Sequence, residues 1–161
     1  MQKVNVQNAL AQALKKDPRY DRDAYEFVKE ALDHTLKTLK KPGREGAIRL
    51  ARETGDPSKL EASHVSGQEL LGGFRALALK QFGPLAKTVL EHWGVRRGED
   101  VGEIVFNMVE VGLLGKTEKD TRADFAGGYD FDSAFVQPFV PPSKRMTRPA
   151  TEPAQEDRAK N

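Results

Sequence analysis

The chain has 161 residues, with 26 basic and 24 acidic side chains and no cysteine. The lack of cysteine excludes a disulfide scaffold, a cysteine nucleophile and thiolate metal sites. No apolar run approaches the roughly 18 residues of a membrane span, so we expect a soluble, cytoplasmic protein with no membrane partner. The charged share is 31%, above the usual ~25%, which predicts that part of the chain lies outside a single folded domain.

The first third of the chain predicts two helices. Residues 4–16 carry apolar side chains at helical spacing, and this helix should stop before Asp17-Pro18 because the residue before a proline avoids the α region. A second helix should begin at Asp21 or Asp23, either of which could cap it, and end at Pro42-Gly43. Its apolar stripe is Tyr25, Val28, Leu32, Leu36 and Leu39.

Residues 42–63 have the composition of an internal linker because five glycine and proline residues interrupt them, although 47–52 could form one or two helical turns. The overlapping stretch 37–52 is basic, with Glu45 as its only acidic residue. It has no aromatic side chain to stack on bases. Its basic side chains that could contact an anion or a nucleic acid are Lys40, Lys41, Arg44, Arg49 and Arg52.

Three further helices are expected in the second half. Ser66 and Glu69 form an S-x-x-E capping box that opens a helix reaching Phe82. Residues 84–93 should form the next, with Leu85 inward, Trp93 as a core anchor and Gly94 at positive φ after it. Asp100 could cap a last helix over 101–114, in which nine of fourteen residues are large and apolar, so this helix should be buried on more than one side. Its polar stripe is Glu103, Asn107 and Glu110.

The segment 125–140 holds five of the twelve aromatic residues, which predicts that it packs on the helices. Tyr129, Asp130, Phe131 and Asp132 alternate between aromatic and acidic, the period of a strand. Tyr129 and Phe131 would then face the core and the two aspartates would face solvent. From residue 141 the apolar pattern ends, so 141–160 is expected to be a disordered tail.

The expected fold is mainly α: one compact five-helix domain over 1–140, with a winged-helix-like back half and a short β-hairpin. The wing would span 115–124 and its returning strand 125–136. The last helix would then be a DNA-recognition helix, but it carries Glu103 and Glu110 and no basic residue between 101 and 114. Since phosphate contacts supply most non-specific DNA affinity, this face should meet a protein or nothing.

None of the motifs that could indicate catalysis or cofactor binding has the residue spacing that its chemistry requires. Gly115-Lys116-Thr117 resembles the end of a phosphate-binding loop, but the glycine required five residues earlier is Glu110. The three histidines, His34, His64 and His92, fall on different elements without metal-ligand spacing. We therefore expect no catalytic, cofactor or metal site. The acidic residues after 117 are expected to be solvated charge and not a cation site: Glu118, Asp120, Asp124, Asp130 and Asp132.

Several short motifs occur together: HVSGQELL at 64–71, FGP at 82–84, WGV at 93–95, GEIVFNMV at 102–109 and YDFDSAF at 129–135. As a set they resemble the Minf-type family, a small uncharacterised bacterial family largely restricted to the Planctomycetes–Verrucomicrobia lineage. The resemblance covers roughly residues 4–140. It implies a lineage but brings no activity, ligand or catalytic residue.

Three functions stay open at this point. The favoured one is a non-enzymatic binding or regulatory module with a protein partner, and its candidate contacts are Tyr129, Asp130, Asp132, Glu103 and Glu110. The alternative is a nucleic-acid or ribosome-associated protein that uses the basic stretch 37–52. The third is an enzyme with an unrecognised site near His64, Glu69 or the acidic cluster. Asp130 and Asp132 could form a docking strip for a basic partner, or could only keep an edge strand from pairing with another chain.

Overall fold

The computed structural model describes residues 5–114 and 121–141, and all regular structure within these two ranges is helical. The predicted mainly α class is confirmed, with six α-helices in the described residues instead of five. None of these helices has the length and apolar character needed to cross a membrane. The α-helices are α1 (Val6–Lys16), α2 (Arg22–Thr38), α3 (Arg44–Thr54), α4 (Gly67–Phe82), α5 (Ala86–His92) and α6 (Gly98–Glu110). Shorter helical segments are η1 (Pro57–Ser63), η2 (Gly83–Leu85), η3 (Arg122–Phe125), η4 (Asp132–Val136) and η5 (Gln137–Phe139).

Local sequence signals place several helix boundaries. The Asn5 side chain caps α1, and the Asp21 side chain caps α2, each by accepting a hydrogen bond from a backbone N–H of the first turn. The predicted capping box of α4 is confirmed: Ser66 Oγ accepts from the Glu69 N–H at 3.0 Å, and Glu69 Oε1 accepts from the Ser66 N–H at 2.9 Å. Gly94 has the predicted positive φ, 93°.

The core lies where α2, α4 and α6 meet, and the segment 125–136 closes it. The closest approach of α2 and α4 is at Gly73, where a Cβ atom would lie 1.8 Å from Thr35 Oγ1. Nearby, the rings of Phe27 and Phe74 stack edge to face with centroids 5.2 Å apart. The small residue on α4 therefore lets the two helices approach closely. The largest fully buried side chains are Tyr25, Phe74, Phe135, Leu71, Leu90, Ile104 and Met108.

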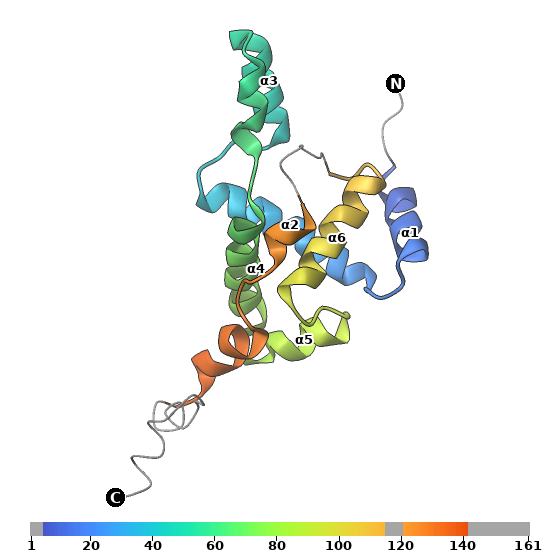
Figure 1. Ribbon diagram of the computed structural model, residues 1–161, viewed down its shortest axis with the longest axis vertical. Helices are drawn as coiled ribbons and strands as arrows, with labels where there is room; N and C mark the ends of the chain where they lie inside the picture. Colours follow the sequence, from blue (N-terminus) through green and yellow to red (C-terminus); the bar gives the residue numbers. More distant parts are fainter. Residues whose placement is uncertain (1–4, 115–120, 142–161) are drawn as a thin grey trace, which may run out of the picture.

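The segment 42–63 is more regular than its linker-like composition predicts, because it contains α3 and η1, which together we call the arm (residues 44–63). The glycines and prolines mark the ends of a helix: Gly43 is the N-cap of α3, and Gly55 ends it with φ of 70°. Ala47 is buried, and α3 packs mainly against η1. Figure 1 shows the arm standing away from the other helices at the top of the molecule.

The predicted strand at 129–132, and with it the returning strand of a hairpin, is wrong. Phe131 begins a helical turn that continues as η4. Asp130 Oδ2 accepts from the backbone N–H and the hydroxyl of Ser133 at 3.2 and 3.1 Å, which caps this turn. Phe131 and Phe135 are buried against each other with centroids 4.9 Å apart. Four alternating residues are too few to establish a strand when a cap and an i, i+4 aromatic pair favour a helical turn.

Other expectations need smaller corrections. Asp100 does not cap the last helix, which begins at Gly98; its carboxylate instead accepts from the Tyr20 hydroxyl at 2.6 Å. Leu85 is 63% exposed and not inward. Trp93 is only half-buried, packed against the rings of Phe27 and Phe82. Most of the predicted wing (115–120) and the predicted tail, apart from residue 141, lie outside the described residues.

Candidate functional site: an apolar groove beside the arm

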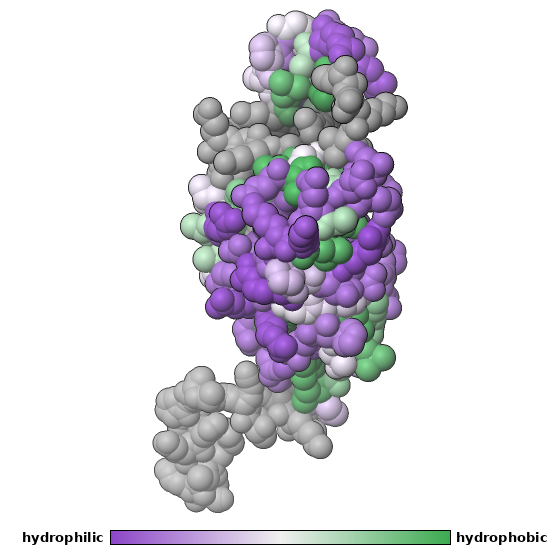
Figure 2. Space-filling model, turned by 90° about the vertical axis from the view of Figure 1, so that its right-hand side faces the viewer, coloured by the Kyte–Doolittle hydropathy of each residue, from purple (hydrophilic) through white to green (hydrophobic). Residues whose placement is uncertain are grey.

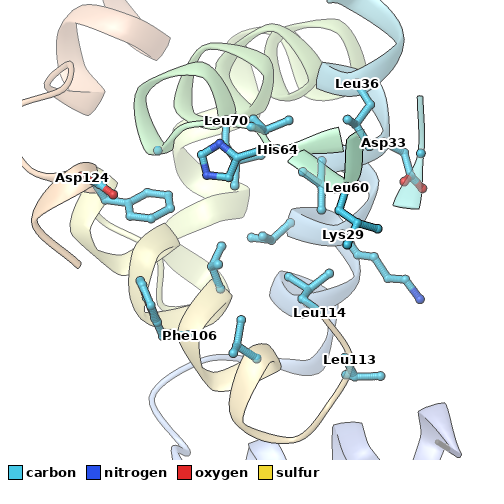
Figure 3. A pocket seen from close by; sticks show the side chains of 18 of the residues that line it. Lys29, Asp33, Leu36, Leu60, His64, Leu70, Phe106, Leu113, Leu114 and Asp124 are labelled. Carbon is cyan, nitrogen blue, oxygen red and sulfur yellow. The ribbon is translucent and has the colours of Figure 1, made fainter. Parts of the chain in front are cut away.

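A groove of about 600 Å³ opens between α2, α6 and the base of the arm (Figure 3). Its size falls within the range of protein sites that bind small molecules or side-chain clusters. The groove is lined mostly by apolar side chains that come from five separate parts of the sequence, the last of which is Phe125 of η3. They include Val28, Leu32 and Leu36; Ile48 and Leu60; Val65 and Leu70; and Val105, Val109, Leu113 and Leu114.

Two helices supply opposing apolar rows. On α2, the row is Val28, Leu32 and Leu36, and on and beyond α6 it is Val105, Val109 and Leu113. Residues four apart lie on one face of a helix, and eight residues rise about 12 Å, so the α2 row is roughly two turns long, whereas the second row is helical only from Val105 to Val109 because α6 ends at Glu110. The α2 row is the stripe that the sequence predicts, but only Val28 of its three groove residues is buried.

The α6 helix carries apolar residues on two sides. Val101, Ile104 and Met108 are buried in the core. Val105 and Val109 are only half-buried, because their side of the helix faces the groove. A helix that is apolar all round is normally covered on all sides. The prediction that this helix is buried on more than one side is confirmed, because Phe106, nearly opposite Ile104 around the helix, is also buried and packs against Phe125; the strip that holds Val105 and Val109 stays half-buried in the described residues.

The arm contributes the upper wall of the groove. Ile48 of α3 and Leu60 of η1 line it, and Leu60 is 49% exposed. In the space-filling view, apolar surface also shows on the arm at the top of the molecule (Figure 2). Lys41 joins the two ends of the arm, because its Nζ donates to the His64 carbonyl oxygen at 2.7 Å and lies 3.5 Å from Glu69 Oε1.

Few charged groups line the groove. Lys29 and Asp33 lie one turn apart on α2, at its edge, and both are exposed. The ring of His64 points into the groove from the chain between η1 and α4 (Figure 3). Asp124 lines the other side, where its carboxylate caps η3 by accepting from the Thr121 N–H at 2.9 Å. The groove is thus an apolar surface with charges mainly on the α2 rim.

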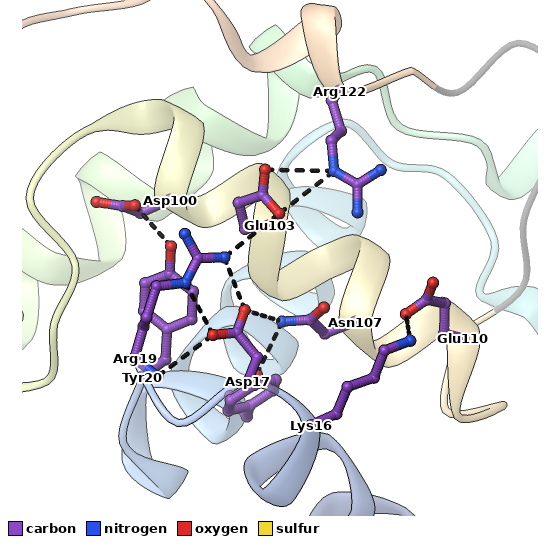
Figure 4. Close-up of polar contacts among 10 residues, drawn as sticks. Lys16, Asp17, Arg19, Tyr20, Asp100, Glu103, Asn107, Glu110 and Arg122 are labelled. Atoms are coloured by element: carbon purple, nitrogen blue, oxygen red, sulfur yellow. Dashed lines mark hydrogen bonds and ion pairs between the residues drawn. The ribbon is translucent and has the colours of Figure 1, made fainter.

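The candidate interaction residues of α6 have partners within the chain (Figure 4). Glu103 lies 3.3 Å from Arg122 and 3.6 Å from Arg19. Glu110 pairs with Lys16 of α1. The acidic face of α6 is therefore largely compensated by basic residues from neighbouring segments, which the sequence pattern alone does not reveal.

Behind these pairs lies a buried polar cluster. Asn107 is 5% exposed, and its side-chain amide donates to Asp17 Oδ2 at 2.8 Å and to the Tyr25 hydroxyl at 3.0 Å. Hydrogen bonds from the Arg19 guanidinium hold the pKa of Asp17 well below its ordinary value. Burial, with the Asp100 carboxylate in contact, raises the pKa of the Tyr20 hydroxyl. The cluster fixes the α1–α2 turn against α6, and its residues do not line the groove described above.

The Tyr129 segment also forms contacts within the chain. The Tyr129 hydroxyl donates to the Leu71 carbonyl oxygen at 2.5 Å, and burial raises its pKa. Asp132 lies 3.3 Å from Lys87 Nζ. The backbone hydrogen bond from Ser133 lowers the pKa of Asp130. Asp130 and Asp132 are exposed and Phe131 is buried, so the predicted division between core and solvent is confirmed although the strand is not.

Of the basic residues predicted to contact an anion or a nucleic acid, one forms contacts within the chain and others are exposed to solvent. Lys41 ties the base of the arm, as described above. Lys40, Arg49 and Arg52 are exposed, and none of the three forms an ion pair with another described residue. Arg49 and Arg52 lie three residues apart on one side of α3. The Arg44 side chain lies outside the described part of the structure.

The candidates for catalysis and metal binding are dispersed. Across residues 5–114 and 121–141, no three His, Cys, Asp or Glu side chains are grouped so that they could hold a metal ion. Glu69, the other residue considered for an unrecognised active site, is engaged in the α4 capping box, and the Ser66 N–H lowers its pKa. No family model, curated protein or solved structure matches the chain.

Proposed function

We propose that the protein is a non-enzymatic binding module whose groove takes an amphipathic helix of a partner protein. The observation that carries this proposal is the side of α6 that lines the groove, where Val105 and Val109 are only half-buried among the described residues. Grooves between helices commonly bind a helix through apolar anchors spaced i, i+3 or i+4, and i+7. Such a helix would cover the side of α6 that holds Val105 and Val109.

The spacing of the two rows supports a helical partner. Val28, Leu32 and Leu36 face the groove from α2, and Val105, Val109 and Leu113 face it from the side of α6. A helix laid along rows of this length would need about eight to eleven residues. Each apolar side chain that it buries fully would contribute about 1.5–3 kcal/mol before the cost of association is subtracted.

The C-terminal tail of the same chain is a poor occupant. Residues 142–161 contain Met146 as their only large apolar residue, so they cannot supply a row of anchors. The last described helical segment, η5, also lies at the opposite end of the molecule from α3 (Figure 1). Both observations favour a separate polypeptide.

The proposal is tested by placing a charge in the groove. Val109→Glu should abolish capture of the partner from a lysate of the source organism, because a carboxylate would be buried against apolar anchors. Leu85→Glu is the matched control, since Leu85 is 63% exposed and does not line the groove. Both variants should keep a cooperative thermal transition. Leu113→Glu repeats the test from outside α6, and capture that survives both groove changes would contradict the proposal.

A nucleic-acid function is the second candidate, and the exposed basic residues on the arm favour it. Arg49 and Arg52 on α3, and Lys40 shortly before it, are exposed and form no ion pair with another described residue. Counterion release would make RNA or heparin retention fall steeply with salt. Arg49→Glu with Arg52→Glu should remove salt-dependent retention if this candidate is correct, and Val109→Glu should not affect it.

The winged-helix likeness and the family resemblance both stay proposals. The order α4, α5, α6 agrees with the three helices of a winged helix. Residues 121–136, however, contain no strand to close a wing. The Minf-type resemblance concerns the lineage and adds no partner to the argument.

A further inference from the structure

We propose that the groove selects its helix by charge: the bound helix carries an acidic side chain facing Lys29 and a basic side chain facing Asp33, one turn apart. The inference rests on the proposed function and specifies the chemistry of the partner. It excludes helices that are equally apolar but carry like charges at these two positions.

The first observation is that Lys29 and Asp33 are left unpaired at the groove. Both line it, both are exposed, and neither forms an ion pair with another described residue. They are four residues apart on α2, a spacing at which opposite charges commonly meet.

The second observation is that opposite charges at the same i, i+4 spacing do meet at two other places in the described residues. On the same helix, Arg22 lies 3.4 Å from Glu26. On α5, Lys87 lies 3.5 Å from Glu91. The charges of α6 and of the arm base are paired as described above. The two charges on the groove rim are thus available to a helix seated beside them.

The third observation is that the two charges lie beside the apolar row of α2. Lys29 and Asp33 flank Leu32, a member of the apolar row of α2, so a helix packed on that row would bring its own flanking residues opposite them. Charges at the edge of an apolar contact add little affinity but discriminate strongly against like charges. Two opposite charges one turn apart would therefore fix the register of the bound helix.

The partner class follows from these three observations. It is a short amphipathic helix with apolar anchors at helical spacing, flanked on one side by a Glu or Asp and a Lys or Arg one turn apart. A helix running in either direction could satisfy the two charges, because the order of its own charges would be reversed with its direction.

The test uses the full chain and three synthetic helical peptides. The peptides share one leucine stripe and differ only at two flanking positions one turn apart, which are Glu and Lys, Glu and Glu, or Lys and Lys. Binding is measured by fluorescence anisotropy at low and at high salt. The wild-type protein should prefer the Glu and Lys peptide by about threefold to tenfold at low salt, and the preference should shrink at high salt.

Single charge reversals then move the preference in predictable directions. Lys29→Glu leaves two acidic groups at the rim, so the variant should prefer the Lys and Lys peptide. Asp33→Lys leaves two basic groups, so that variant should prefer the Glu and Glu peptide. Lys80→Glu is the control: Lys80 is exposed on α4 and does not line the groove, so the wild-type order should be kept.

The outcomes separate the two proposals. If all three peptides bind the wild type and both reversal variants with equal affinity, charge selection is overturned while the groove function stands. If no peptide binds the wild type, or if binding survives Val109→Glu, the groove function fails and charge selection fails with it. If the preferred peptide changes with each charge reversal as stated above, both the groove function and charge selection are supported.

Discussion

At the scale of single residues, the polar cluster around Asn107 differs most from the surface role that the sequence pattern predicts. Asn107 belongs to the polar stripe of α6, together with Glu103 and Glu110, and the pattern treats all three alike. In the fold, Asn107 is buried and donates to Asp17 and Tyr25. The partners lie more than eighty residues away in sequence, so helical periodicity carries no signal for them.

Replacing this amide should destabilise the fold. Asn107→Ala removes the hydrogen bonds to the Asp17 carboxylate and to the Tyr25 hydroxyl, while Asp17 keeps those from Arg19, so we expect the free energy of unfolding to fall by about 1.5–3 kcal/mol. Chemical denaturation would measure it. Asn8→Ala, at an exposed position of α1, should change stability by less than about 0.5 kcal/mol. Equal effects at the two positions would show that the cluster contributes nothing specific.

Acid sensitivity should depend on Asp17. Because the Arg19 hydrogen bonds lower its pKa in the folded state, the unfolded state binds a proton more readily. The stabilisation is therefore present above the ordinary Asp pKa of about 3.9 and is lost as pH falls below it. Asp17→Asn should reduce stability at neutral pH and flatten its decline in acid, as melting temperatures across pH would show. Arg19→Met should act similarly, and the double variant should add little.

At the scale of elements, neighbouring glycines of α4 should respond in opposite ways to the same substitution. A Cβ at Gly73 would lie 1.8 Å from Thr35 Oγ1, whereas a Cβ at Gly72 meets nothing within 4 Å. Gly73→Ala should cost about 1–3 kcal/mol by overpacking. Gly72→Ala should stabilise the exposed side of the helix by about 0.5–1 kcal/mol. Thermal denaturation measures the stability of both variants. If both substitutions changed stability in the same direction, the close crossing of α2 and α4 would be contradicted.

Periodicity predicts elements well where a helix has one apolar face and clear ends. The helices near 6–16, 22–38 and 67–82, and the Ser66 capping box, follow from apolar spacing and capping residues. Periodicity fails where glycines can have two meanings: those around α3 mark the ends of a helix, but glycines are just as common in linkers. It also fails at 129–132, where a four-residue alternation is outweighed by the Ser133 hydrogen bonds to Asp130 and by aromatic packing.

The arm should depend on one side chain for its attachment. Lys41→Met removes the hydrogen bond to the His64 carbonyl oxygen and the ion pair with Glu69. Amide exchange should then accelerate across 44–63 and stay unchanged in α4, as measured by hydrogen–deuterium exchange. Lys37→Met, at an exposed position on α2, is the control and should change neither region. Exchange that accelerates equally everywhere would show that Lys41 supports the whole fold.

At the scale of the whole molecule, basic residues near the start of the chain form ion pairs with acidic residues of its later, acidic section. Residues 1–60 carry 13 basic and 9 acidic side chains, and residues 98–137 carry 3 and 9. The fold brings these sections together, so that Lys16 meets Glu110 and Arg19 meets Glu103. Part of the asymmetry that suggested a charged partner is therefore used to join α1 and the α1–α2 turn to α6.

The groove itself could not be read from the sequence, because its lining comes from five separated segments and each apolar residue resembles an ordinary core position. One signal was present: the helix over 101–114 has more apolar residues than a single core contact requires. That signal indicates an extra contact of α6. Only the packing of α2, α6 and the arm shows that the side of α6 with Val105 and Val109 stays half-buried at the groove in the described residues.

The closeness of the two ends of the arm has a consequence for how this chain can be re-engineered. Since the side chain of Lys41, which follows α2, reaches the carbonyl oxygen of His64, a cassette between these points can be exchanged with little penalty in loop closure. Replacing 43–63 with a short glycine-rich turn should leave a cooperative melting transition and the helical circular dichroism of α1, α2, α4, α5 and α6. Loss of that transition would mean that the body needs the insert. A tolerant body would make the arm a natural site for grafting a foreign binding element.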